Sequence, residues 1–157
     1  MNEVAQLKHT FLMTLTLDVN ANDPQIVGTI GRQKRIIAGI NGGSFSGPLL
    51  HGHVLPGGAD WVLMGSDGSM DIDVRTTLQT NDGALIYLQY KGRFLAAAKA
   101  KKKLSNGLSL SADEYSLAVT AIFETGHDQY NWLNDAIVVG TGVQQGFNPT
   151  YSFFTVG

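Results

Sequence analysis

The sequence predicts an all-β protein: an antiparallel β-barrel of about eight or more strands with short helical inserts. Three observations support this fold class. Apolar and polar residues alternate in short runs along the chain, and a period of two is typical of strands. Glycine, with 19 of 157 residues, is concentrated between these runs, where turns are expected. One run alone is rich in strong helix formers, and no linker divides the chain, so we expect a single domain over residues 1–157.

The expected strands follow one another along the chain with turn residues between them. The first, residues 8–19, alternates apolar residues with threonines and ends at an Asn-Ala-Asn-Asp-Pro turn. A helix is expected over residues 95–104, which read LAAAKAKKKL, and a short helix from Asp128 to Asn134. Outside the hairpin described next, further strands are expected at residues 25–30, 35–40 (closed by an Asn-Gly-Gly turn), 49–55, 60–64, 115–125, 136–143 and 150–156.

The clearest hairpin joins residues 69–80 to residues 84–94 through Asn81-Asp82-Gly83. If these residues form the loop, Gly83 takes the left-handed conformation of a bulged hairpin. This register makes one face apolar and gives the other face opposite-charge pairs, which favours it over a shorter turn. The predicted pairs are Leu78 with Ile86, Val74 with Tyr90, Met70 with Phe94, Thr77 with Tyr87, Arg75 with Gln89, Asp73 with Lys91, and Asp71 with Arg93.

Charge and composition exclude several classes of partner and chemistry. A net charge of −2 gives no electrostatic reason to bind nucleic acid or an anionic membrane. The chain has no cysteine, which excludes disulfides, thiol nucleophiles and thiolate metal sites. The N-terminus lacks a secretory signal pattern, and no apolar run approaches the ~20 residues that span a bilayer. We therefore expect a cytoplasmic protein that binds neither nucleic acid nor membrane.

Motifs for common cofactors and nucleophiles are weak. The glycine-rich run Gly39–Gly43 precedes Pro48 and a strand-like segment, so no helix N-terminus follows it to bind phosphate. His51 and His53 share a strand face, but no third histidine stands at metal-binding spacing. The serines of Gly43–Gly47 lack the strand-turn-helix context of a nucleophile elbow. We therefore expect no metal and no cofactor.

The polar face of the hairpin carries the main candidate site residues. Strand alternation places Asp71, Asp73, Arg75, Tyr87 and Gln89 on one face. On the outside of a barrel they would be surface groups whose ion pairs contribute about 0–1 kcal/mol each. On the inside they would be buried, and the aspartate could move a proton on a bound substrate. The usual apolar-in, polar-out rule favours the outside, and both orientations remain open.

Aromatic residues near the predicted loops are further candidates. Trp61, Tyr130 and Trp132 could anchor the core or form the wall of a ligand site, and the core is the better supported role. Asp60 and His53 lie close to Trp61 in the sequence and complete the expected ligand-binding set together with Gln89.

Several motifs, in order, resemble an uncharacterised bacterial family, the domain of unknown function three-two-three-seven, also called uncharacterised protein family zero-three-one-one. They are Gly52–Trp61 (GHVLPGGADW), Asp73–Arg75 (DVR), Asp82–Tyr87 (DGALIY), Phe123–Gly126 (FETG) and Tyr130–Asn134 (YNWLN). The resemblance implies a barrel similar to allene oxide cyclase, a shape that often has a ligand-sized lumen, and it implies no established reaction. It makes an inward-facing row at Asp73, Arg75 and Tyr87 about as well supported as an outward one.

The expected function is binding of a small molecule in the barrel interior or mouth. The first alternative is a cofactor-independent isomerase, cyclase or lyase acting on a small hydrophobic or aromatic metabolite. In that enzyme Asp73 or Glu124 would transfer the proton, Arg75 would hold an anion and Tyr87 would donate a hydrogen bond. The second alternative is a non-catalytic protein that uses one barrel face to form a homodimer or larger homo-oligomer. The sequence does not decide whether the chain is an enzyme, what it binds or how it assembles.

Overall fold

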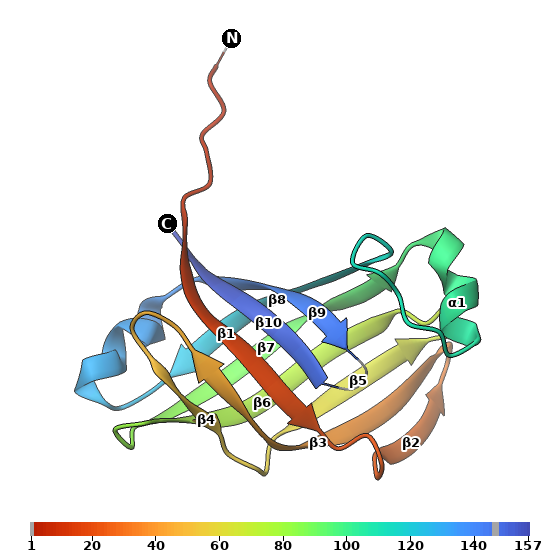
Figure 1. Cartoon of the computed structure of the whole chain (residues 1–157), viewed down its shortest axis with the longest axis horizontal. Helices are drawn as coiled ribbons and strands as arrows, with labels where there is room; N and C mark the ends of the chain where they lie inside the picture. The colour runs from red at the N-terminus through yellow and green to blue at the C-terminus, as the bar shows by residue number, and fades with distance from the viewer. Residues whose placement is uncertain (1, 146–147) are drawn as a thin grey trace.

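A computed structural model describes residues 2–145 and 148–157. Its ten strands form one antiparallel sheet that closes on itself as a barrel (Figure 1). The strands are β1 (His9–Val19), β2 (Gln25–Ile30), β3 (Gln33–Ser46), β4 (His51–Val54), β5 (Ala59–Gly65), β6 (Met70–Thr80), β7 (Leu85–Ala96), β8 (Tyr115–Glu124), β9 (Val138–Gln145) and β10 (Asn148–Val156). The helical segments are η1 (Ala98–Ala100), α1 (Lys101–Ser105) and η2 (Asp128–Asp135).

The barrel has eight strand positions around its circumference. The other two of the ten strands each share a position with another strand. β1 closes the sheet because it pairs with β10 on one edge and with β3 on the other. β4 and β5 both lie between β3 and β6, where β4 pairs with one end of β6 and β5 with the other end. β2 pairs with the part of β3 that lies beyond β1. The all-β barrel predicted from the sequence is confirmed.

The predicted β6–β7 hairpin is also confirmed, including its register. All seven predicted pairs occur, from Met70 with Phe94 to Leu78 with Ile86. The backbone of Gly83 has a φ of +91°, in the left-handed region where glycine is favoured. The amide of Gly83 donates a hydrogen bond to the carbonyl of Thr80 at 2.9 Å, which closes the loop. The side chains of β6 therefore alternate between the interior and the outer face as the pattern predicted.

Two local expectations were wrong. The helix-forming run 95–104 begins as strand, because Leu95 and Ala96 continue the β7 ladder against β8, and α1 is only five residues long. Tertiary pairing thus overrides the helix propensity of alanine and leucine. The expected turn at Asn41-Gly42-Gly43 is instead the middle of β3, with a register shift opposite Asp18 and Val19. A Cβ on Gly43 would lie 2.2 Å from the carbonyl oxygen of Thr16, so glycine permits a close approach of two strands there.

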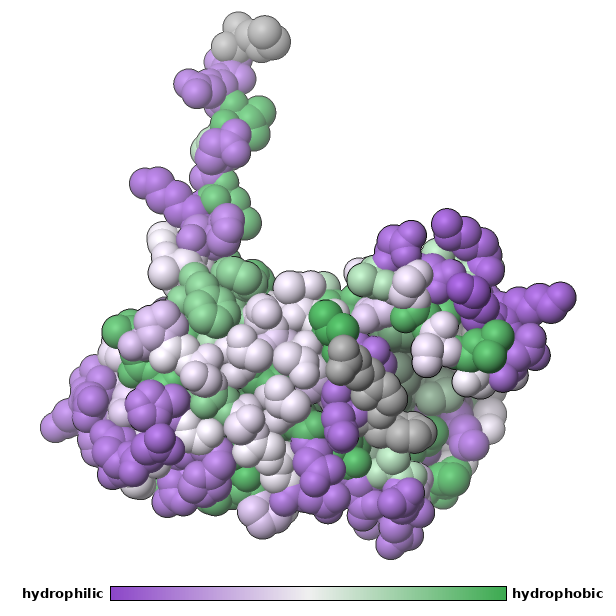
Figure 2. Space-filling model, in the orientation of Figure 1, coloured by the Kyte–Doolittle hydropathy of each residue, from purple (hydrophilic) through white to green (hydrophobic). Residues whose placement is uncertain are grey.

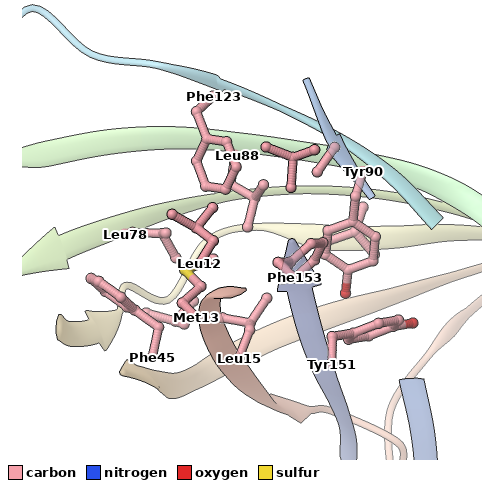
Figure 3. Close-up of a cluster of buried hydrophobic side chains, with 14 of the residues drawn as sticks. Leu12, Met13, Leu15, Phe45, Leu78, Leu88, Tyr90, Phe123, Tyr151 and Phe153 are labelled. Atoms are coloured by element: carbon pink, nitrogen blue, oxygen red, sulfur yellow. The ribbon is translucent and has the colours of Figure 1, made fainter. Parts of the chain in front are cut away.

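The barrel interior is filled at the end that η2 covers (light blue, at the left of Figure 1). Leu133 of η2 is fully buried, and Tyr130 of η2 is 6 % exposed. Fully burying one large apolar side chain stabilises the fold by roughly 1.5–3 kcal/mol. The strands contribute a continuous apolar cluster to this end, part of which Figure 3 shows: Leu12, Met13, Leu15, Phe45, Leu78, Leu88 and Phe123.

The opposite end, beside α1, is less completely covered. Strand pairing points the side chains of Ile36, Ala38 and Met64 inward. Ile36 pairs with buried Val62, and Met64 lies two residues further along the same strand. Ala38 pairs with Asp60, which in turn pairs with buried Val74. All three are only half-buried, as are Met70 and Tyr115 at the same end. Figure 2 shows a hollow in the surface beside the hydrophilic corner that carries α1. The two ends of the barrel therefore differ in how far they exclude solvent.

Candidate functional site

The polar row of the β6–β7 hairpin lies on the outer face of the barrel. Along β6 the side chains of Ile72, Val74 and Leu78 are buried, whereas Asp73 is half-buried and Arg75 is exposed. Tyr87 and Gln89 share the outer face with them, because they pair with Thr77 and Arg75. The structure therefore selects the outward orientation that the sequence left open. The chemistry that required an enclosed chamber around Asp73, Arg75 and Tyr87 does not apply to this arrangement.

On this outer face Arg75 packs against Trp61. The guanidinium carbon of Arg75 lies 5.4 Å from the centroid of the Trp61 ring, and its Nη2 lies 3.9 Å from Oδ2 of Asp73. With 51 % of the Arg75 side chain exposed, such an ion pair contributes about 0–1 kcal/mol. Any role of these residues in a ligand site stays a prediction.

The other sequence-predicted residues are dispersed. His53 is exposed on β4, where it pairs with Ser44 and Gln79. Glu124 is exposed at the end of β8, opposite Tyr87. Glu124 therefore adjoins the outer row at Tyr87, and His53 lies beside Gln79, four residues along β6 from Arg75.

Tyr130 and Trp132 belong to η2, at the filled end of the barrel. The Tyr130 hydroxyl lies 3.1 Å from both carboxylate oxygens of Asp82 and ties η2 to the β6–β7 turn. Tyr130 is therefore part of the cover of this end, and Trp132 is half-buried against the same core.

Asp60 is the sequence-predicted residue that points into the barrel. It pairs with Ala38 of β3 and Val74 of β6, and Val74 is buried. Its Oδ1 accepts a hydrogen bond from the backbone N–H of Asp73 at 3.2 Å. Burial raises the pKa of the Asp60 carboxyl to about 6, and the negative charge of Asp73 adds to this effect. Asp60 forms no ion pair with a lysine or arginine in the described part of the chain.

Two tyrosines lie in the interior near Asp60. Tyr90 of β7 is 1 % exposed and Tyr151 of β10 is 2 % exposed, with their ring centroids 4.9 Å apart (Figure 3). Burial raises the pKa of both phenols, and the negative charge of Asp60 raises it further. The two hydroxyls lie near each other, but the Tyr90 hydroxyl has no partner with hydrogen-bond geometry among the described residues. Asp60 and the two phenols form a cluster of polar side chains inside a largely apolar barrel. We call this cluster the interior polar site.

Sequence reasoning missed the two tyrosines of this site. The predicted hairpin register already placed Tyr90 in the inward apolar row opposite Val74. A hydroxyl in such a row was the available signal, because a buried phenol normally has a hydrogen-bond partner. The proximity of Tyr151 could not be predicted, since β10 reaches β7 only through the closure of the barrel.

Two glycines of β9 give the aromatic rings their space. A Cβ on Gly142 would lie 2.5 Å from Cδ2 of Leu117 and 2.9 Å from Cε1 of Tyr151. A Cβ on Gly140 would lie 2.8 Å from the ring of Phe153. The absence of side chains at these positions therefore allows the rings of β10 to turn into the barrel.

The barrel wall is irregular beside Asp60. The β5–β6 pairing runs from Ala59 opposite Arg75 to Asp60 opposite Val74, and resumes only at Leu63 opposite Asp71. In the gap, the N–H of Asp73 donates a hydrogen bond to the Asp60 carboxylate at 3.2 Å. On the outer side, Oδ1 of Asp73 is buried without a partner among the described residues. The interior polar site thus lies where the pairing between β5 and β6 is interrupted.

Two depressions of the outer surface differ from this site. A shallow groove of about 800 Å³ runs over the outer face of β7, β8, β9 and β10. A smaller pocket of about 390 Å³ lies at the filled end, between His51, Asn81, Asp82 and Tyr130. Its polar groups bond to one another, for example Nδ2 of Asn81 with Nδ1 of His51 at 2.7 Å. The described residues hold no cluster of three or more metal-ligating side chains, and no described helix is long and apolar enough to cross a membrane.

A family model described as "Protein of unknown function (DUF3237)" matches residues 6–156. The chain belongs to this family. A UPF0311 protein of Rhodopseudomonas palustris is 28 % identical over 144 residues, which cover 92 % of each chain. The solved structure of a beta-barrel like protein from Acinetobacter baumannii is 34 % identical and covers all of both chains, with a TM-score of 0.85. The family resemblance expected from the sequence is confirmed.

One relative has a name that states a reaction. The hydroalkoxylation enzyme phnH of Penicillium herquei is 28 % identical over 109 residues, which cover 69 % of this chain and 58 % of that protein.

Proposed function

We propose that this member of the DUF3237 family binds a small, largely apolar molecule in the α1 half of the barrel interior. The observation that carries the proposal is the buried Tyr90 hydroxyl, which has no partner in the described part of the chain. Leaving a buried hydroxyl unpaired costs about 1–3 kcal/mol, so an acceptor oxygen on a ligand would recover that free energy. The negative charge of Asp60 raises the pKa of this phenol, which places the carboxylate in the same part of the interior, where it would accept a hydrogen bond from a hydroxyl of the ligand.

The form of the barrel supports this proposal. An eight-stranded barrel has an interior that side chains fill or that holds one small ligand. Here the interior is filled at the η2 end, whereas Ile36, Ala38 and Met64 at the α1 end are half-buried. Ligand sites are mostly apolar with a few convergent polar groups, as Asp60, Tyr90 and Tyr151 are.

The test uses 2-naphthol, a fluorescent aromatic molecule with a single hydroxyl. We expect saturable binding by the purified protein, measured by fluorescence titration. Tyr90→Phe should weaken binding about threefold to tenfold, the value of one hydrogen bond. Tyr87→Phe makes the same change on the outer face of the same strand and should leave the affinity unchanged.

The two variants also separate the inner site from the outer row. Weaker binding by Tyr87→Phe with normal binding by Tyr90→Phe would move the site to the outer face and contradict the proposal. Failure of the wild-type protein to bind 2-naphthol would contradict it as well.

A second candidate function is a cofactor-independent isomerase, cyclase or lyase. The specific observation that favours it is the Asp60 carboxyl, whose pKa of about 6 suits proton transfer near neutral pH. The reaction named for the Penicillium relative is consistent with chemistry in this family.

We also retain a homodimer and a cytoplasmic location as predictions. The outer groove over β7 to β10 includes Leu95, Val139 and Phe154 and is the apolar surface on which a second copy would pack. Light scattering checks the first prediction, since a monomer at all concentrations would contradict it. Fractionation of the source cells checks the second.

A further inference from the structure

We propose that the interior polar site catalyses proton transfer at a carbon next to a carbonyl group, with Asp60 as the base and the Tyr90 hydroxyl as hydrogen-bond donor to the carbonyl oxygen. This inference rests on the ligand site proposed above and assigns its substrate class: neutral, apolar ketones.

The charges in the site favour a neutral substrate. Asp60 has no cationic partner among the described residues, so a substrate carboxylate or phosphate would be repelled by it and would lose its hydration. Lys34 points inward in strand order, but it is exposed at the rim of the barrel. The walls of this half are apolar, with Val62 and Ile72 in adjacent positions of β5 and β6.

The phenols favour a carbonyl as the group that binds them. Because their pKa is raised, Tyr90 and Tyr151 remain protonated and can donate hydrogen bonds at neutral pH. The Tyr90 hydroxyl needs an acceptor, and a carbonyl oxygen supplies one. That hydrogen bond strengthens as negative charge develops on the oxygen, which is how a donor accelerates a reaction rather than only binding the substrate. An aspartate base combined with a phenol donor is a known arrangement for this chemistry.

Asp60 is placed to act as the base. Its Oδ1 accepts a hydrogen bond from the backbone N–H of Asp73 at 3.2 Å, which orients the carboxylate. The titratable groups that face it in the interior are Tyr90 on β7 and Tyr151 on β10, and the negative charge of Asp73 on the outer face also raises the pKa of Asp60. With a pKa of about 6, Asp60 is a carboxylate at neutral pH and a moderately strong base for its type.

The step is balanced without a co-reactant. The Asp60 carboxylate takes a proton from the carbon next to the carbonyl, and the electron pair of that C–H bond forms a carbon–carbon double bond. The π pair of the carbonyl moves onto oxygen, which accepts the hydrogen bond from Tyr90. The Asp60 carboxylic acid then returns the proton to the same carbon, which gives exchange, or to a conjugated carbon two positions further on, which gives an isomer. Nothing is oxidised or reduced.

The test follows hydrogen–deuterium exchange of 2-tetralone in D₂O by proton NMR. 2-Naphthol, the binding probe above, is the aromatic counterpart of the enol of 2-tetralone. We expect the wild-type protein to accelerate loss of the signal of the protons between the ring and the carbonyl, and 2-naphthol to inhibit this exchange competitively. The rate should rise with pH through about 6 and then level off, because Asp60 must be ionised.

Asp60→Asn should reduce exchange by ~10²–10⁴-fold while 2-naphthol still binds. The matched control is Asp71→Asn on the outer face of β6, which should retain the wild-type rate. If Asp60→Asn does not fold, Tyr90→Phe replaces it and should slow exchange at least about tenfold, the loss of one transition-state hydrogen bond.

Three results would overturn the inference. Exchange no faster than in buffer, in protein that binds 2-naphthol, overturns it and leaves the proposed ligand site standing. Exchange by Asp60→Asn at the wild-type rate has the same meaning. Absence of 2-naphthol binding overturns both the ligand site and this inference.

Discussion

The two halves of the barrel interior are built from the same strands but differ in composition and closure. At the η2 end the inward side chains are aliphatic or aromatic, and Leu133 of η2 fills the opening. At the α1 end some inward side chains, such as Ile36, Ala38 and Met64, are only half-buried, and the interior contains Asp60 with two phenols. The first half has the features of a core that stabilises the fold. The second half has the features of a functional site, whose buried polar groups lower the stability of the fold.

One alternating pattern of residues can therefore serve two purposes along the length of a strand. The inward row of β7 reads Ile86, Leu88, Tyr90, Gly92, Phe94, and only its middle residue carries a polar group. Polar atoms are costly in an apolar interior unless they bond or react. The two halves should therefore differ both in their contribution to stability and in their chemistry.

The largest expected difference is between truncations at the two ends. Leu133→Ala should lower the free energy of unfolding by about 2–5 kcal/mol, since it leaves a cavity among fully buried groups. Met64→Ala, at the half-buried α1 end, should cost about 1 kcal/mol, because water already reaches its surroundings. Urea unfolding of both variants measures the difference. Equal losses would show that the two ends are equally closed.

The second prediction concerns the charge of Asp60. The folded protein raises its pKa from 3.8 to about 6, so the folded state binds the proton more tightly than the unfolded chain does. The buried carboxyl therefore costs nothing below about pH 4, and its cost grows between about pH 4 and 6 and stays constant above. Asp60→Asn should accordingly stabilise the fold by ~2–3 kcal/mol at pH 7 and not at pH 4.

Urea unfolding at both pH values measures this effect. The matched control is Asp71→Asn, which removes an exposed pair with Arg93 at 3.1 Å and should destabilise the fold by at most about 1 kcal/mol. A loss of stability at pH 7 in Asp60→Asn would mean that the carboxylate has a stabilising partner, contrary to the account.

A third prediction concerns the space that glycine provides in β9. Gly142→Ala should cost about 1–3 kcal/mol, because the new methyl group meets Leu117 and displaces Tyr151. Binding of 2-naphthol should weaken with it. Gly126→Ala is the matched control, since a Cβ there meets nothing within 4 Å. Thermal unfolding with and without 2-naphthol compares them, and an unchanged affinity in Gly142→Ala would argue that Tyr151 is not part of the site.

The smallest effect is expected on the outer row. Arg75→Gln removes a long ion pair with Asp73 and a stacking contact with Trp61. It should change the free energy of unfolding by less than about 1 kcal/mol, and it should not alter 2-naphthol binding. A large loss of affinity would return the site to the outer face.

Much of the fold was predictable because β patterning is local. The register of the β6–β7 hairpin followed from Asn81-Asp82-Gly83 and from the alternation on either side. The fate of residues 95–104 was not predictable, because pairing with β8 decides it rather than local propensity. The barrel closure depends on β1 pairing with both β3 and β10, which no local pattern records.

The candidate site was predicted only in part. Asp60 was among the expected ligand-binding residues, although its sequence context gives no indication that it points inward. The chemically conspicuous row of Asp73 and Arg75 lies outside, as the usual rule for antiparallel sheets favoured. Tyr90 was placed in the correct row, but its unpaired hydroxyl becomes visible only when all neighbouring strands are present.

The central claim, that the α1 end admits small molecules to the interior and the η2 half does not, can be measured directly because the chain has no cysteine. Ala38→Cys places a single thiol on the half-buried inward row beside Asp60, and Ala84→Cys places one in the core at the η2 end, at a position 3 % exposed in the β6–β7 loop that Tyr130 contacts. The account predicts that a small uncharged thiol reagent modifies the first variant rapidly in the native state, that 2-naphthol slows this reaction, and that the second variant reacts only on unfolding. Equal protection of both thiols would contradict it.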